Sequence, residues 1–166
     1  FYQWLKNNFE NLLKLKNKIL LYAIAKSINI KATYIMNDER EILINSSSRA
    51  MLNFGHTFGH AIETINKYHS NLTHGEAISI GMAIEAKISY KLNNIEKYEL
   101  DDILDHLKNV GLPYSTKKIK INKIYKIITS DKKNTNNKIN LVLLKKIGAA
   151  YYKRGLNITK IKNFIN

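Results

Sequence analysis

Residues 49–63, RAMLNFGHTFGHAIE, constrain the fold more than any other stretch because they combine two glycines with two histidines four residues apart. The spacing predicts a helix over residues 49–67. Such a helix would gather the polar side chains of the stretch within about 80° of one another on one face. That polar stripe comprises Arg49, Asn53, His56, His60 and Glu63.

An ordinary amphipathic helix with a solvated polar face is the simpler explanation of this stripe. The solvated faces of the other predicted helices are rich in lysine and glutamate, whereas the stripe holds no lysine and two of the five histidines. Gly55 and Gly59 would each cost roughly 1 kcal/mol relative to alanine inside a helix. Their presence indicates a close approach of another backbone or a ligand. We therefore interpret the stripe as part of a functional site.

Histidines at positions i and i+4 can share one metal ion, as in the HExxH motif. The spacer here is Thr-Phe-Gly, so the general-base glutamate of that motif is absent and a zincin protease is disfavoured. His74 follows in LTHGEA, at the predicted start of the next helix, where an imidazole tends to stay neutral and suits metal binding.

One histidine of the pair, His74 and a carboxylate would form an open three-ligand site. The other histidine would then be available for acid–base catalysis, and spacing alone does not decide which is which. Arg49 and Asn53 are suited to holding anionic groups of a substrate.

Hydrophobic periodicity predicts a mainly α fold with one short β element near residues 139–153. The helix over residues 75–92 is apolar nearly all round, which predicts a buried central helix. The predicted helices cover residues 1–15, 17–34, 49–67, 75–92, 96–110, 119–129 and 157–164, and the predicted strands cover 140–144 and 149–153. Polar loops are expected at residues 37–48, 68–73 and 130–137.

The composition limits the classes of protein and partner. The 166 residues suit one domain, and the absence of cysteine excludes disulfides and cysteine-ligated zinc and fits a reducing, cytoplasmic compartment. The net charge of +14 is scattered and almost entirely lysine, which indicates a compositional bias more than a nucleic-acid surface. No apolar run is expected to span a membrane, and the first residues are too lysine-rich for a signal peptide.

The motifs R-A-M-L-N-F-G-H-T-F-G-H-A-I-E and L-T-H-G-E-A-I-S-I-G-M together resemble the 3-dehydroquinate synthase family of the shikimate pathway. The similarity extends through Lys31-Ala32, D-E-R-E at 38–41, V-G-L-P at 110–113, D-K-K at 131–133 and L-V-L-L-K-K-I-G at 141–148. The similarity covers nearly all 166 residues of this chain. In the family these residues correspond only to the C-terminal, helical half, which is the metal- and substrate-binding domain. The N-terminal NAD-binding half is expected to precede Phe1.

The resemblance implies conversion of 3-deoxy-D-arabino-heptulosonate 7-phosphate to 3-dehydroquinate and phosphate, on the route to chorismate and the aromatic amino acids. This lyase reaction proceeds by transient oxidation with bound NAD, phosphate elimination, re-reduction and aldol cyclisation. A divalent metal, zinc or cobalt, acts as Lewis acid. The family further implies a cytoplasmic homodimer with a small phosphorylated sugar acid as substrate, and no nucleic-acid or membrane partner.

His56 and His74 match the two metal-binding histidines of the family, whose third ligand is a glutamate in a segment before Phe1. The chain alone is therefore expected to have an incomplete site and to be inactive. His60 matches a catalytic histidine that relays protons near the phosphate.

The substrate contacts implied by the family fall mainly on cationic side chains. Arg49 and Asn53 match substrate-anchoring positions, and Lys31 matches a lysine that holds the anionic end of the substrate. One lysine of the pair Lys132 and Lys133 matches a further anion contact. The loop over residues 42–48 is longer than is usual in the family and is expected to bulge.

Three other functions are compatible with parts of this pattern. A related sugar-phosphate cyclase would share the metal histidines but differ in substrate contacts, so Lys31, Arg49 and Asn53 favour the synthase. A metal-dependent polyol dehydrogenase of the same superfamily would release NADH. A basic helical nucleic-acid-binding module would show steep salt dependence of DNA binding, which we expect to be absent.

Overall fold

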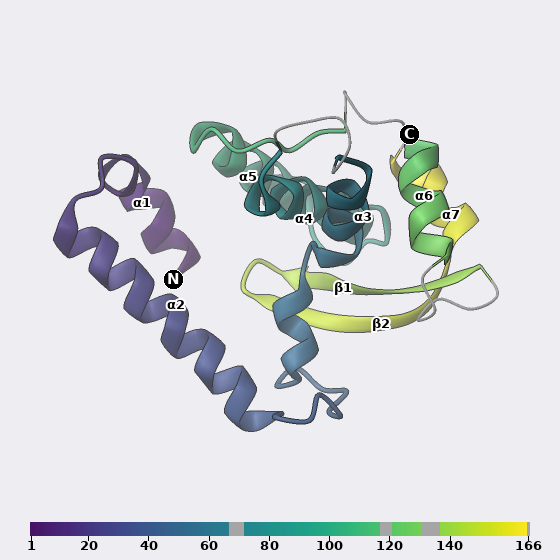
Figure 1. The fold of residues 1–166 in the computed structure, drawn as a ribbon, viewed down its shortest axis with the longest axis horizontal. Coiled ribbons are helices and arrows are strands. Elements are labelled where there is room, and N and C mark those ends of the chain that lie inside the picture. Colours follow the sequence, from purple (N-terminus) through teal and green to yellow (C-terminus); the bar gives the residue numbers. More distant parts are fainter. Residues whose placement is uncertain (67–71, 117–120, 131–136, 166) are drawn as a thin grey trace.

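The computed structural model describes residues 1–66, 72–116, 121–130 and 137–165 of the chain (Figure 1). The elements in chain order are α1 (Tyr2–Leu13), α2 (Asn17–Asn37), the 3₁₀ helix η1 (Arg49–Asn53), α3 (His56–Asn66), α4 (His74–Lys91), α5 (Lys97–Asn109), α6 (Ile121–Ser130), β1 (Lys138–Lys146), β2 (Ala149–Asn157) and α7 (Ile158–Ile165). The prediction of a mainly α fold is confirmed. Within the described ranges the sheet is a single antiparallel hairpin of β1 and β2. The loops predicted at residues 68–73 and 130–137 fall largely outside those ranges.

Helix α4 is the buried central helix that its composition predicts. A capping box fixes its start: the Thr73 hydroxyl accepts the Glu76 N–H, and the Glu76 carboxylate accepts the Thr73 N–H. Ile84 and Ile88 of α4 pack with Phe58 of α3 in the main core, which also includes the inward side chains of β1. In Figure 1 the hairpin lies beneath α3 and α4, with α6 and α7 over one end of it.

The backbones of α3 and α4 nearly touch where they cross. A Cβ added at Gly81 of α4 would lie 1.9 Å from the carbonyl oxygen of Gly55. A Cβ at Gly59 would lie 3.0 Å from Cα of Ile78 and 2.6 Å from its Cδ1. The close backbone approach expected from the two motif glycines is therefore present, and Gly81 is its third member.

The prediction of one continuous helix over residues 49–67 is wrong. The chain forms η1, then turns at Gly55, whose φ of +83° lies in the left-handed region, and restarts as α3 at His56. The Gly55 N–H donates to Oε2 of Glu85 on α4 at 2.6 Å. Since Glu85 lies thirty residues further along the chain, the local pattern of residues 49–63 could not reveal this break.

Helices α1 and α2 form an arm that extends away from the rest of the molecule (Figure 1). Across residues 1–37, all of which the structure describes, no side chain is buried, and Leu21, Ile24 and Ile28 are exposed. Near its N-terminus the arm contacts the body where Tyr2 Oη donates to the carbonyl of Asp102 at 3.1 Å and Lys6 pairs with the Asp102 carboxylate. At the other end of the arm, Tyr34 of α2 packs against the buried cluster of Ala50 and Met51.

The expectation that no apolar segment is long enough to cross a membrane needs correction. Among the described residues, the 21-residue α2 is the one helix whose length and composition meet that criterion. One such helix is weak evidence of a membrane protein, since a core helix of a soluble protein or a signal sequence meets the same criterion.

Substitution of Gly81 by alanine tests the close crossing. Gly81→Ala should lower the free energy of unfolding by at least about 1–3 kcal/mol, because the new Cβ would collide with backbone atoms that cannot move independently. Gly75→Ala is the matched control: it lies on the same helix with nothing within 4 Å of the added Cβ. It should be neutral or stabilising by up to about 1 kcal/mol. Denaturant unfolding measures both, and equal effects would contradict the crossing.

Glu85 should make stability depend on pH. Burial raises its pKa well above the ordinary 4.5, although the Gly55 N–H acts in the opposite direction. The unfolded chain ionises near that ordinary value while the folded chain keeps the proton, so stability falls as pH rises above it. Glu85→Gln keeps an acceptor for Gly55 and removes the titration. The free energy of unfolding of the Glu85→Gln variant, measured from about pH 5 to 8, should therefore decline less with pH than that of the wild type. Parallel profiles would contradict a buried neutral acid.

Candidate metal and substrate site

Three histidines converge where α3 and the start of α4 meet. The ring centroids of His56 and His60 lie 5.3 Å apart, those of His56 and His74 lie 6.1 Å apart, and those of His60 and His74 lie 5.9 Å apart. His56 and His60 are one turn apart on α3, whereas His74 reaches them only because α4 crosses α3 closely. The structure thus brings together the three histidines that the sequence singled out.

Two of these rings have Nδ1 held by an acceptor. His56 Nδ1 lies 3.2 Å from the Phe54 carbonyl oxygen, and His74 Nδ1 lies 3.2 Å from Oε2 of Glu63. In a neutral ring such an acceptor places the proton on Nδ1 and leaves a lone pair on Nε2. Zinc binds unprotonated imidazole nitrogen at about 2.0–2.1 Å. In that tautomer His56 and His74 each offer a nitrogen donor of the kind that a divalent metal binds.

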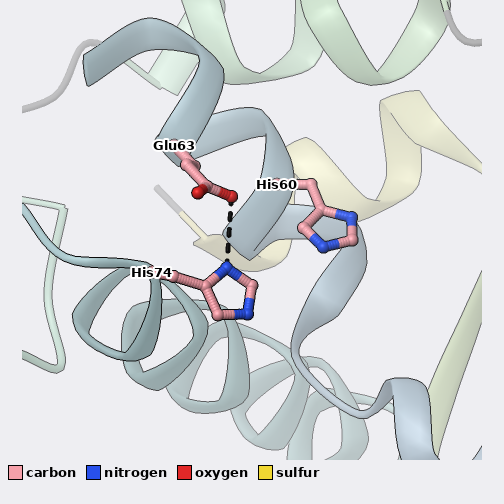
Figure 2. A group of neighbouring side chains, drawn as sticks. All are labelled: His60, Glu63 and His74. Atoms are coloured by element: carbon pink, nitrogen blue, oxygen red, sulfur yellow. Dashed lines mark hydrogen bonds and ion pairs between the residues drawn. The ribbon is translucent and has the colours of Figure 1, made fainter. Parts of the chain in front are cut away.

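A second ligand set is geometrically available. One ligand atom each from His60, Glu63 and His74 lies within 4.8 Å of the others, as Figure 2 illustrates. In that set Glu63 would contribute a carboxylate oxygen directly. The two sets share His74 and differ in whether His56, or the pair of His60 and Glu63, completes the ligands from this chain.

Two hollows beside the histidines share three lining residues: Glu41, Asn53 and His56. The first, of about 330 Å³, is also lined by His60. The second, of about 620 Å³, is also lined by Lys31 and Arg49.

The second hollow places the predicted cationic contacts on the same side as the predicted metal ligand. Lys31 comes from α2 and Arg49 from η1, and both line it together with Asn53 and His56. A lysine and an arginine that line one hollow suit an anionic group of a small molecule. Lys132 and Lys133 lie outside the described residues, so their anion contact stays a prediction.

Glu41 is a site residue that the sequence analysis missed. It lines both hollows, and its Oε1 accepts from Nδ2 of Asn53 at 3.4 Å. Its φ of +53° is uncommon for a residue other than glycine, a kind of strain that often occurs at functional sites. Its place at the end of D-E-R-E, directly before the long loop, is the one signal in the sequence that points to it.

Asp38 ties the long loop to the site. Its Oδ1 accepts the N–H groups of Ile42 and Leu43 at 2.8 and 3.2 Å, and its Oδ2 accepts the Arg49 N–H at 3.0 Å. Burial raises the pKa of this carboxyl, but these donors and the Ser48 hydroxyl outweigh it and hold the pKa below its ordinary value of 3.8. One side chain therefore fixes both ends of the loop over residues 42–48.

Comparison with known families gives a consistent match. A family model described as 3-dehydroquinate synthase C-terminal matches residues 1–134. The chain is 43% identical over 149 residues to the 3-dehydroquinate synthase of Thermodesulfovibrio yellowstonii, covering 89% of this chain and 40% of that protein. It is 37% identical over 169 residues to that of Pelagibacter ubique, covering 99% and 45%. The chain thus spans less than half the length of these curated relatives.

Solved structures share the fold. The 2-epi-5-epi-valiolone synthase ValA of Streptomyces hygroscopicus subsp. jinggangensis 5008, with NAD⁺ and Zn²⁺ bound, matches at a TM-score of 0.79 and 18% identity, covering 98% of this chain and 44% of that one. A 2-deoxy-scyllo-inosose synthase complexed with carbaglucose-6-phosphate, NAD⁺ and Co²⁺ matches at a TM-score of 0.57 and 22% identity, covering 70% and 35%. At these identities the likeness shows a common architecture only.

Alanine substitutions separate the two ligand sets. In the longest reading frame that contains this chain, His56→Ala and His74→Ala should each lose bound zinc, because each removes an Nε2 ligand. His60→Ala should retain zinc. Zinc content after dialysis, measured by elemental analysis, is the readout. Zinc lost from His60→Ala but kept by His56→Ala would reverse the assignment.

Proposed function

This chain belongs to the 3-dehydroquinate synthase C-terminal family, and on that premise we propose that it is the metal- and substrate-binding half of a 3-dehydroquinate synthase. The whole protein would convert 3-deoxy-D-arabino-heptulosonate 7-phosphate to 3-dehydroquinate and phosphate. The observation that carries the proposal is the convergence of His56, His60 and His74 beside a hollow lined by Lys31 and Arg49.

His56 and His74 would hold the divalent metal through Nε2, with Nδ1 of each ring already occupied by an acceptor. Bound zinc would supply Lewis acidity toward substrate hydroxyls, and NAD would supply transient oxidation of the substrate. The third ligand expected from the family is a glutamate outside this chain. A site that draws ligands from two halves would form only in the longer protein.

Lys31, Arg49 and Asn53 would bind and orient the substrate. The two cations line the same hollow as the metal ligand His56, so they can fix the anionic groups while the hydroxyls face the metal. Asn53, already within reach of Glu41, can hydrogen-bond a hydroxyl through its amide. Such fixed orientation supplies much of the rate enhancement in a reaction with several steps on one substrate.

His60 would move a proton. It lines the first hollow with Asn53 and His56, next to the position where substrate must lie if it contacts Lys31. A neutral imidazole can take a proton and return it within one turnover. The phosphate-elimination step of the proposed reaction requires such a transfer.

The rest of the longer protein would supply the NAD-binding half. We propose that this half packs against the exposed apolar side chains of α2, which include Leu21, Ile24 and Ile28. Such packing would account for the length and apolar composition of the 21-residue helix α2, because its apolar face would be buried against protein and not in a membrane. The assembled enzyme would be a cytoplasmic homodimer without nucleic-acid partners.

A related sugar-phosphate cyclase is the second candidate, because the structural matches are cyclases that act on other substrates. Identities of 43% and 37% to dehydroquinate synthases, against 18% and 22% to those cyclases, favour the first candidate. The two differ in which phosphorylated substrate is consumed.

The activity itself is the first test. The longest reading frame that contains this chain should, with NAD and zinc, release phosphate from 3-deoxy-D-arabino-heptulosonate 7-phosphate together with dehydroquinate and without net NADH. Phosphate release and dehydroquinate absorbance are followed in the same reaction. Turnover of a different sugar phosphate alone would favour another cyclase, and accumulation of NADH would favour a polyol dehydrogenase.

Lys31→Met should raise KM for the phosphorylated substrate about tenfold or more, because a charge-assisted hydrogen bond contributes about 1.5–3 kcal/mol. Its zinc content should not change. Lys26→Met is the matched control, since it removes the same charge from α2 at a residue that does not line the hollow. Equal KM values for the two variants would contradict a contact between Lys31 and the substrate.

A further inference from the structure

Glu63 joins the two helices that carry the histidines. It lies on α3 one turn after His60, and its Oε2 lies 3.2 Å from Nδ1 of His74 at the start of α4 (Figure 2). The two side chains are 35% and 57% exposed, respectively. An imidazole this exposed would be free to rotate without a partner, so the contact with Glu63 is what sets its orientation.

The chemistry of the contact selects one tautomer of His74. An ionised carboxylate can only accept, so Nδ1 carries the proton, and Nε2 keeps its lone pair in the neutral ring that binds a metal. A carboxylate on Nδ1–H also raises the basicity of the opposite nitrogen as a metal ligand.

The other glutamate near His74 cannot serve the same purpose. Glu76 lies two residues along α4, but its Oε2 accepts both the N–H and the hydroxyl of Thr73 at 2.8 Å. It is committed to the capping box that starts the helix. Glu76 therefore gives a matched control that removes a nearby negative charge without touching the His74 ring.

We propose that Glu63 is a positioning residue of the metal site, which holds His74 with Nδ1 protonated and Nε2 directed at the ion. This role rests on the proposed function, in which His74 binds the metal. It assigns to Glu63 an effect through His74 and not a bond to the metal. The same carboxylate could instead be a ligand, since it lies within 4.8 Å of ligand atoms of His60 and His74, and the experiment separates the two roles.

The test measures zinc affinity and the His74 tautomer in the longest reading frame that contains this chain. Glu63→Ala should weaken zinc binding by about 10–100-fold, the usual cost of removing such a partner. Glu63→Gln should lose less affinity, because the amide oxygen still accepts from Nδ1. Nitrogen NMR of the zinc-free protein should show the proton of His74 on Nδ1 in the wild type and Glu63→Gln, and a tautomer mixture in Glu63→Ala. Glu76→Gln should keep both the affinity and the tautomer close to wild type.

Two results would overturn the proposal. If Glu63→Gln loses as much zinc affinity as His74→Ala while the tautomer is unchanged, Glu63 is a direct ligand. If Glu63→Ala binds zinc as tightly as the wild type, the hydrogen bond has no part in the site. Both readouts are independent of turnover. They therefore remain informative if the protein fails to make dehydroquinate, which would count against the proposed function alone.

Discussion

The near-contact of the α3 and α4 backbones is the constraint on which the rest of the structure depends. Gly55, Gly59 and Gly81 leave no room for a Cβ at the crossing, and no larger residue would let the helices come as close. The crossing sets His74 of one helix beside His56 and His60 of the other. It also brings Glu85 to the Gly55 N–H. This hydrogen bond holds the turn at Gly55, after which α3 starts at His56, a candidate metal ligand. The same contact between α3 and α4 thus contributes to the hydrophobic core and brings the residues of the candidate site together.

Three carboxyl groups then fix the details of the site. Glu85 holds the turn before His56, Asp38 holds both ends of the loop that follows Glu41, and Glu63 holds the ring of His74. Each accepts from a group that would otherwise be free to reorient. In this account the residues that would contact metal or substrate are oriented by acidic residues that would not, which is how a site attains the orientation that catalysis requires.

The sequence predicts those parts of this structure that depend on periodicity and motif. The helical fold, the buried α4 and the hairpin follow from hydrophobic patterns, and the histidine cluster follows from the motif. The break between η1 and α3 does not, because it depends on Glu85, a partner distant in sequence. Glu41 was missed for a similar reason: its role comes from a left-handed backbone and two hollows that only the folded chain forms. Local patterns identify elements, whereas their junctions depend on tertiary contacts.

The central claim is that the crossing of α3 and α4 presents His56 and His74 to one metal ion. The most direct test is a crystal structure of the zinc-loaded protein in the longest reading frame, with the ion located by anomalous scattering. Zinc should lie on Nε2 of both His56 and His74, with Nδ1 of His74 still hydrogen-bonded to Glu63. Zinc bound by His60 and the Glu63 carboxylate, with His56 turned away, would contradict it.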